Sequence, residues 1–303
     1  MQSKGTAMYK PTEETISGKA GKIFLRSWSS QKAPNAIVVL CHGFNSHGGM
    51  YLWTGKRLSE NGFHTYALDL RGRGKSEGAR FFVSSFEEYV EDVKSLIDVV
   101  KLRHPNVPVF LFGHSAGGVA SCIYTLDHRQ DLAGLICESF AFKLPAPDFA
   151  LAAIGFLSRF LPNMKAVTLK NSNVSRDPDV VAAMNADPLI AGESQPASTA
   201  AALVRANARL DRDFASIRLP LLVMHGTADR ATLPRGSEQF YAEAGSSDKI
   251  LKIYKDRYHD LLSDFGKEEV IADIIAWLNG RSSPSKNLAE TDGTNGVASE
   301  RGK

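Results

Sequence analysis

The 303-residue chain lacks the features that mark secreted, membrane-spanning or nucleic-acid-binding proteins. It has three widely spaced cysteines in apolar surroundings, which predicts buried free thiols rather than a disulfide framework. No window approaches the roughly 20 apolar residues of a membrane span, and the polar stretch 1–15 has no signal-peptide core. A net charge of +3 without a cluster of Lys or Arg gives no support for nucleic-acid binding. We therefore expect a soluble, cytoplasmic protein.

Apolar β-branched runs alternate with helical patterns along most of the chain, which is typical of a mostly parallel sheet with helices on both faces. Strands are expected over residues 15–29 (as a hairpin), 36–41, 64–70, from 108, 132–137, 219–225 and 249–254. Helices are expected over residues 51–61, 85–104, 119–128, 237–244 and 268–278. The alternation stops over 141–217, where we predict a helical cap inserted between two parts of the core, 1–140 and 218–280. Residues 281–303 are polar and are expected to form a disordered tail.

The stretch Val109 to Gly118 carries the most specific motif in the chain. Four apolar residues lead into Gly113-His114-Ser115-Ala116-Gly117, which fits the pattern Gly-x-Ser-x-Gly. In that motif a serine occupies a strained strand-to-helix turn, and the flanking glycines leave room for the neighbouring backbone. An apolar helical segment follows, so the context favours a nucleophilic serine over an incidental tight turn.

A serine hydroxyl needs a general base, and three histidines follow Ser115 in the chain. His128 lies at the far end of the helix after the nucleophile, and His225 ends a strand, where packing or a turn hydrogen bond is expected. His259 follows the last strand on a loop that can reach the nucleophile. We therefore predict that His259 is the base.

The base needs an acid that orients it, and two carboxylates follow strand ends. We favour Asp229, because it lies in a turn-rich loop between Ser115 and His259; Glu138 remains the alternative. An oxyanion hole requires two backbone N–H groups. By position these are the N–H groups of Phe44 and Ala116.

The predicted cap contains an unbroken apolar run, residues 149–157, bounded by prolines. A helix that is apolar all round must be buried or must rest on something apolar. It either packs on cap partners such as Leu203 and Val204, or it roofs an acyl tunnel above Ser115 and touches lipid surfaces transiently. For the tunnel we expect pocket contributions from Phe149, Ile154 and Phe156.

These segments together resemble the monoacylglycerol lipase and lysophospholipase branch of the α/β-hydrolases. The matching stretches are 42–51, Asp69-Leu-Arg-Gly-Arg-Gly-Lys-Ser76, 113–118, His225-Gly-Thr-Ala-Asp229 and Tyr258-His259. The resemblance implies an eight-stranded α/β-hydrolase sheet with the cap after the sixth strand. It also implies a cofactor-free serine hydrolase that cleaves single-chain lipid esters through an acyl-enzyme.

The chain departs from the mammalian members of this branch in its first loop. Ser46 and Met50 stand where those enzymes have a glutamate and an arginine near the glycerol head, so we expect these two residues in the pocket and a loose head-group preference. No metal is expected, because His42 and His47 lack ligand partners at a useful spacing. The rival hypotheses are an S33-type aminopeptidase and a non-enzymatic ligand receptor on the same fold.

Overall fold

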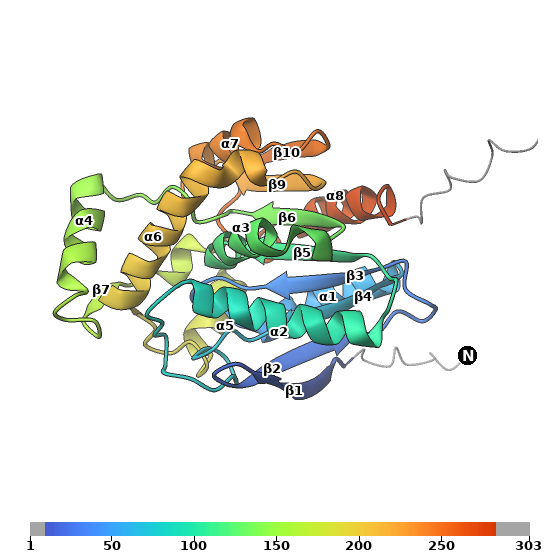
Figure 1. Ribbon diagram of the computed structural model, residues 1–303, viewed down its shortest axis with the longest axis horizontal. Helices are drawn as coiled ribbons and strands as arrows, with labels where there is room; N and C mark the ends of the chain where they lie inside the picture. The colour runs from blue at the N-terminus through green and yellow to red at the C-terminus, as the bar shows by residue number, and fades with distance from the viewer. Residues whose placement is uncertain (1–9, 283–303) are drawn as a thin grey trace, which may run out of the picture.

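An eight-stranded sheet organises residues 10–282, the part of the chain that the computed structural model describes (Figure 1). Its strands lie in the order β1-β2-β4-β3-β5-β6-β9-β10. Their bounds are Thr12–Gly18 (β1), Gly21–Trp28 (β2), Ala36–Cys41 (β3), Phe63–Leu68 (β4), Val109–His114 (β5), Gly134–Glu138 (β6), Leu221–Gly226 (β9) and Lys249–Tyr254 (β10). Strand β2 pairs antiparallel with β1 and β4, and the other pairings are parallel. The predicted α/β-hydrolase sheet is confirmed.

Two apolar cores form on opposite faces because successive side chains of a strand point in opposite directions. Ile37 and Val39 of β3 pack in the core beneath α2 (Glu87–Arg103), α3 (Ala116–His128) and α7 (Pro234–Glu243). Val38 and Leu40 pack in the core beneath α1 (Leu52–Glu60) and α8 (Lys267–Asn279). Because both faces of β3 are covered, all six of its residues are buried. The three cysteines are buried and free, as predicted.

The segment between β6 and β9 carries α4 (Asp148–Leu157), β7 (Lys165–Val167), α5 (Pro178–Ala186), β8 (Gln195–Pro196) and α6 (Ala197–Asp213). In Figure 1 these elements lie beyond the carboxyl ends of the central strands, with α6 running from the sheet toward α4. Strands β7 and β8 pair in a small antiparallel sheet. The sequence pattern did not predict it, because strands of three and two residues have no periodicity to detect.

The carboxyl-terminal helix α8 is followed by an anchored turn. Arg281 forms an ion pair with Asp248, and Ser282 is buried. The described fold therefore extends to Ser282, and the rest of the predicted tail, 283–303, lies outside the described residues. Within 10–282, no helix combines the length and the apolar character needed to cross a bilayer.

Candidate active site

Ser115 lies at a sharp turn between β5 and α3. Its backbone has φ 53° and ψ −121°, a conformation that L-residues rarely adopt and that stores strain at functional turns. A Cβ on Gly113 would lie 2.6 Å from the Cα of Gly118, and one on Gly117 would lie 2.3 Å from the carbonyl oxygen of Cys41. Both glycines are therefore required by backbone contact, as the motif predicts.

The side chains of Ser115, His259 and Asp229 form a continuous hydrogen-bonded chain. His259 Nε2 lies 2.9 Å from Ser115 Oγ, and His259 Nδ1 lies 2.7 Å from Asp229 Oδ2. Asp229 follows β9, and His259 follows β10. Backbone bonds from Thr227 to Tyr254 (2.9 Å) and from Ala228 to Arg257 (3.0 Å) join these two connections. The structure thus brings together the three residues that the sequence singles out.

Asp229 is held by more donors than the base alone. The backbone N–H of Ala231 and of Thr232 donate to Oδ1 at 2.7 and 3.0 Å, and the Thr232 hydroxyl donates to Oδ2 at 2.7 Å. His225 Nε2 also lies 2.9 Å from Oδ2, and its Nδ1 lies 2.7 Å from Ser237 Oγ. The sequence predicts packing or a turn hydrogen bond for His225 and not this contact with the acid, although a histidine four residues before the acid at a strand end is a detectable pattern.

These contacts set the protonation states of the pair. Burial raises the pKa of Asp229, but the charge of His259 and the hydrogen bonds from His225 and His259 outweigh it, so the pKa lies well below its usual range. Burial lowers the pKa of His259, yet the neighbouring Asp229 carboxylate raises it above its ordinary value overall. Asp229 is therefore ionised wherever His259 titrates.

The alternative acid, Glu138, is fully buried at the end of β6 and forms no hydrogen bond to His259 within residues 10–282. Its Oε1 accepts from the backbone N–H of Leu261 at 2.6 Å. Burial and the nearby Asp260 carboxylate raise its pKa well above the usual value. Glu138 thus supports the loop that carries His259.

The two backbone groups expected to form an oxyanion hole flank the nucleophile. The backbone of Gly43, next to Phe44, is so close that a Cβ on it would lie 2.7 Å from Ser115 Cβ. Among the described residues, neither the N–H of Phe44 nor that of Ala116 donates to another protein group. The loop is fixed by Glu193, which accepts from the backbone N–H of Asn45 at 2.8 Å and pairs with buried Arg73.

An apolar cavity of about 60 Å³ lies beside Ser115. Residues from the β3 loop and from the segment between β6 and β9 line it, among them Phe44, Leu151, Ile154, Val167, Leu169 and Leu203. The amide of Gln195 is a polar exception, and no acidic side chain lines this cavity among the residues described. Helix α4 thus packs against α6, as the first alternative for residues 149–157 predicts, and also lines the cavity beside the nucleophile. The acyl tunnel and the lipid contact of the second alternative stay predictions.

Four residues expected in the pocket lie elsewhere. Phe149 and Phe156 are 78% and 59% exposed and do not line the cavity. They lie seven positions apart on one face of α4, whereas Leu151 and Ile154 share the face toward the cavity. Ser46 is buried in the first loop, and Met50 packs against the apolar cluster of Val174, Met184 and Ile190 instead.

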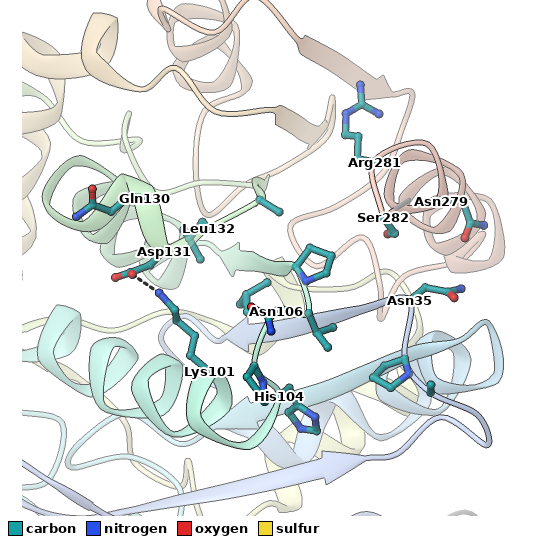
Figure 2. Close-up of a pocket in the computed structure, with 17 residues that line it drawn as sticks. Asn35, Lys101, His104, Asn106, Gln130, Asp131, Leu132, Asn279, Arg281 and Ser282 are labelled. Carbon is teal, nitrogen blue, oxygen red and sulfur yellow. Dashed lines mark hydrogen bonds and ion pairs between the residues drawn. The ribbon is translucent and has the colours of Figure 1, made fainter. Parts of the chain in front are cut away.

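A larger hollow of about 1150 Å³ lies at the opposite end of the sheet (Figure 2). It is lined by the residues that precede β5 and by the turn after α8, including His104 and Arg281. Its lysine, Lys101, is paired with Asp131. Ser115 follows the other end of β5, so this hollow is remote from the nucleophile.

Comparison with known proteins identifies the family. Residues 32–265 match the Hydrolase_4 family model, described as serine aminopeptidase, S33. The chain belongs to this family. It is 31% identical to a monoacylglycerol lipase of Mycolicibacterium smegmatis, over 88% of this chain and 96% of the relative. It is 30% identical to human monoglyceride lipase, over 90% of this chain and 92% of the relative. A crystal structure of Paleococcus ferrophilus monoacylglycerol lipase superposes with a TM-score of 0.75 at 30% identity, over 86% of this chain and 99% of the lipase. The predicted branch is confirmed.

Proposed function

We propose that this protein is a monoacylglycerol lipase-like carboxylic ester hydrolase that acts through Ser115, His259 and Asp229. The observation that carries the mechanism is the hydrogen-bonded chain of these three side chains opening onto an apolar cavity. The relatives named above support the same class of reaction.

In this mechanism His259 removes the proton of the Ser115 hydroxyl through Nε2 as Oγ attacks the ester carbonyl. Asp229 accepts from Nδ1, which fixes the tautomer and stabilises the imidazolium. The N–H groups of Phe44 and Ala116 stabilise the oxyanion. His259 then protonates the leaving alcohol, and a water activated by the same nitrogen hydrolyses the acyl-enzyme. No step requires a cofactor.

The substrate we propose is a single-chain acyl ester with a loosely recognised head group. The cavity beside Ser115 is apolar, which suits an acyl chain, and each methylene that it buries contributes about 0.8 kcal/mol. An aminopeptidase needs a carboxylate for the free amine of its substrate. The lining described above offers none, which disfavours that rival. A receptor without activity would have no use for the strained turn at Ser115.

We propose that residues 141–217 act as a cap whose outer face meets lipid surfaces transiently. Its exposed apolar side chains are clustered on α4 and the turn that follows: Phe149, Phe156, Leu157, Phe160, Leu161 and Met164. Clusters of exposed apolar side chains mark interaction surfaces of a protein. A lipid ester is dissolved in a lipid surface, which an apolar cluster can contact. Substrate can then pass from the lipid to the cavity beneath α4.

The proposal is tested by comparing the wild type with Ser115→Ala. We expect the wild type to hydrolyse monoacylglycerols and p-nitrophenyl esters, to leave aminoacyl amides intact and to be labelled by a fluorophosphonate. Ser115→Ala should lose about 10⁶-fold in kcat and all labelling, with an unchanged melting temperature. Labelling of Ser115→Ala, or faster cleavage of the amides than of the esters, would refute it.

A further inference from the structure

A polar cluster with two buried members and one half-buried member includes the residue that follows His259. It consists of His114, which precedes the nucleophile, Glu138 at the end of β6, and Asp260. The β5–β6 register pairs His114 with Glu138, and ligand atoms of all three residues lie within 4.8 Å of one another. None of these side chains takes part in the proposed proton relay.

Two atoms of this cluster, His114 Nε2 and Glu138 Oε2, are buried and have no hydrogen-bond partner among residues 10–282. Their residues are 3% and 0% exposed. The rest of each side chain is oriented: Glu138 Oε1 accepts from Leu261, and the ring of His114 contacts the backbone of His259. Burial lowers the pKa of His114 to about 4, so the ring is neutral. The cluster thus combines an unpaired imidazole nitrogen and an unpaired carboxyl oxygen with the nearby carboxylate of Asp260, and unpaired buried polar atoms of this kind call for a ligand.

We propose that His114, Glu138 and Asp260 bind a divalent cation of the Zn²⁺ class. One imidazole nitrogen and two carboxylate oxygens are ligands that Zn²⁺ accepts at about 2.0–2.2 Å, with a water completing the tetrahedron. Mg²⁺ and Ca²⁺ favour all-oxygen sets with more ligands. The backbone contact of His114 is the kind of outer partner that orients metal-bound imidazoles. Asp260 is half-buried, so its side chain offers an entry path and the freedom to draw the ligands together.

Occupancy of this site inhibits hydrolysis. The rings of His114 and His259 have their centroids 4.8 Å apart. A divalent cation beside His114 therefore repels the positive charge of the imidazolium that His259 must form during acylation. Water screens this repulsion little, because both rings are buried. This consequence rests on the proposed function, whereas metal binding does not depend on it.

Metal binding is tested without turnover by calorimetric titration of metal-stripped Ser115→Ala with ZnCl₂ and, separately, MgCl₂. We expect one Zn²⁺ site and no Mg²⁺ binding at the same concentrations. Adding Asp260→Asn or Glu138→Gln should abolish the Zn²⁺ site. Asp256→Asn removes an exposed carboxylate from the same β10–α8 connection and should leave it intact. Melting curves establish that each variant is folded. Unchanged Zn²⁺ affinity in both cluster variants would overturn the proposal.

Inhibition is measured as the ratio of p-nitrophenyl ester hydrolysis with and without ZnCl₂, each variant being its own reference. The wild type and Asp256→Asn should lose about tenfold or more of their activity. Asp260→Asn and Glu138→Gln should keep a ratio near one. Persistent inhibition in these two variants would mean that Zn²⁺ acts on His259 directly, and binding without inhibition would remove the regulatory consequence. A protein that binds Zn²⁺ but neither hydrolyses esters nor reacts with fluorophosphonate would refute the proposed function and leave the metal site standing.

Discussion

The connection that carries Asp229 and the helix α4 line the same cavity, but they are built in opposite ways. Asp229 accepts hydrogen bonds from His225, Thr232 and His259 and is 8% exposed. Helix α4 has no fully buried residue, and its two largest side chains, Phe149 and Phe156, are 78% and 59% exposed. One region is fixed by many polar contacts, and the other is held by one apolar face packed on α6.

This difference indicates that α4 can move more easily than the hydrogen-bonded relay. Proton transfer needs heavy atoms held within hydrogen-bond distance, so the relay has to be rigid. The cavity of about 60 Å³ is small, and α4 forms part of its wall through Leu151 and Ile154. A shift of α4 would widen the cavity for an acyl chain without disturbing the hydrogen bonds of the relay.

The largest effect is expected from Asp229→Asn, which breaks the relay and leaves the cap intact. An amide at this position favours the wrong tautomer of His259, at a cost of about 10⁴ in kcat where this has been tested on a triad. The measurement is kcat on a short p-nitrophenyl ester, with the melting temperature as a check on folding.

Glu138→Gln is the matched control for that change. Burial and the Asp260 carboxylate raise the pKa of Glu138 well above its usual value, and an amide is nearly isosteric with the carboxyl group and can still accept from Leu261. We expect kcat in metal-free buffer to stay within about tenfold of the wild type, because a neutral hydrogen bond contributes a free energy that corresponds to about that factor. If Glu138→Gln is the less active of the two variants, Glu138 is the acid.

His225→Leu should weaken the relay without severing it. The change removes one donor to the Asp229 carboxylate, and hydrogen bonds to charged groups contribute about 1.5–3 kcal/mol. We expect kcat to fall by roughly 10- to 100-fold with KM little changed. His225→Gln retains an N–H near Nε2 and should recover most of the loss. Equal defects in both variants would assign His225 to packing alone.

The acid limb of the pH profile reports the same relay. Asp229 raises the pKa of His259 above its ordinary value of about 6.5, so the base is protonated below that raised pKa. Activity should therefore be full on the alkaline side and fall about tenfold per pH unit once the pH drops below the raised pKa. A plot of log kcat/KM against pH measures the midpoint. A midpoint below about 6.5, or a flat profile from pH 6 to 8, would contradict the role of His259.

The contrast between the regions also explains what the sequence could predict. Ser115, its glycines and the chain order of Asp229 and His259 are local or sequential patterns, so the sequence alone predicts them. The orientation of α4 could not be found, because a segment that is apolar all round has no polar face to indicate which side is buried. The group of His114, Glu138 and Asp260 is assembled by the register of β5 and β6 and by a loop, and no spacing in the sequence encodes it.

The smallest effects should come from α4, where the two faces can be tested separately. Ile154 lines the cavity, whereas Phe156 is 59% exposed on the other side. Ile154→Ser should flatten the rise of kcat/KM with acyl-chain length in solution, because a tunnel that buries each methylene gains about 0.8 kcal/mol from it, roughly fourfold. Phe156→Ser should leave that rise unchanged within about twofold and slow the hydrolysis of monoacylglycerol in phospholipid vesicles several-fold, since an exposed aromatic contributes by entering the lipid surface. Acetate esters serve as the control for both variants, because they are too short to use the tunnel. If Phe156→Ser alters chain-length preference in solution as much as Ile154→Ser does, the outer face of α4 also contacts the acyl chain, and the separation of relay, tunnel and lipid-facing surface is wrong.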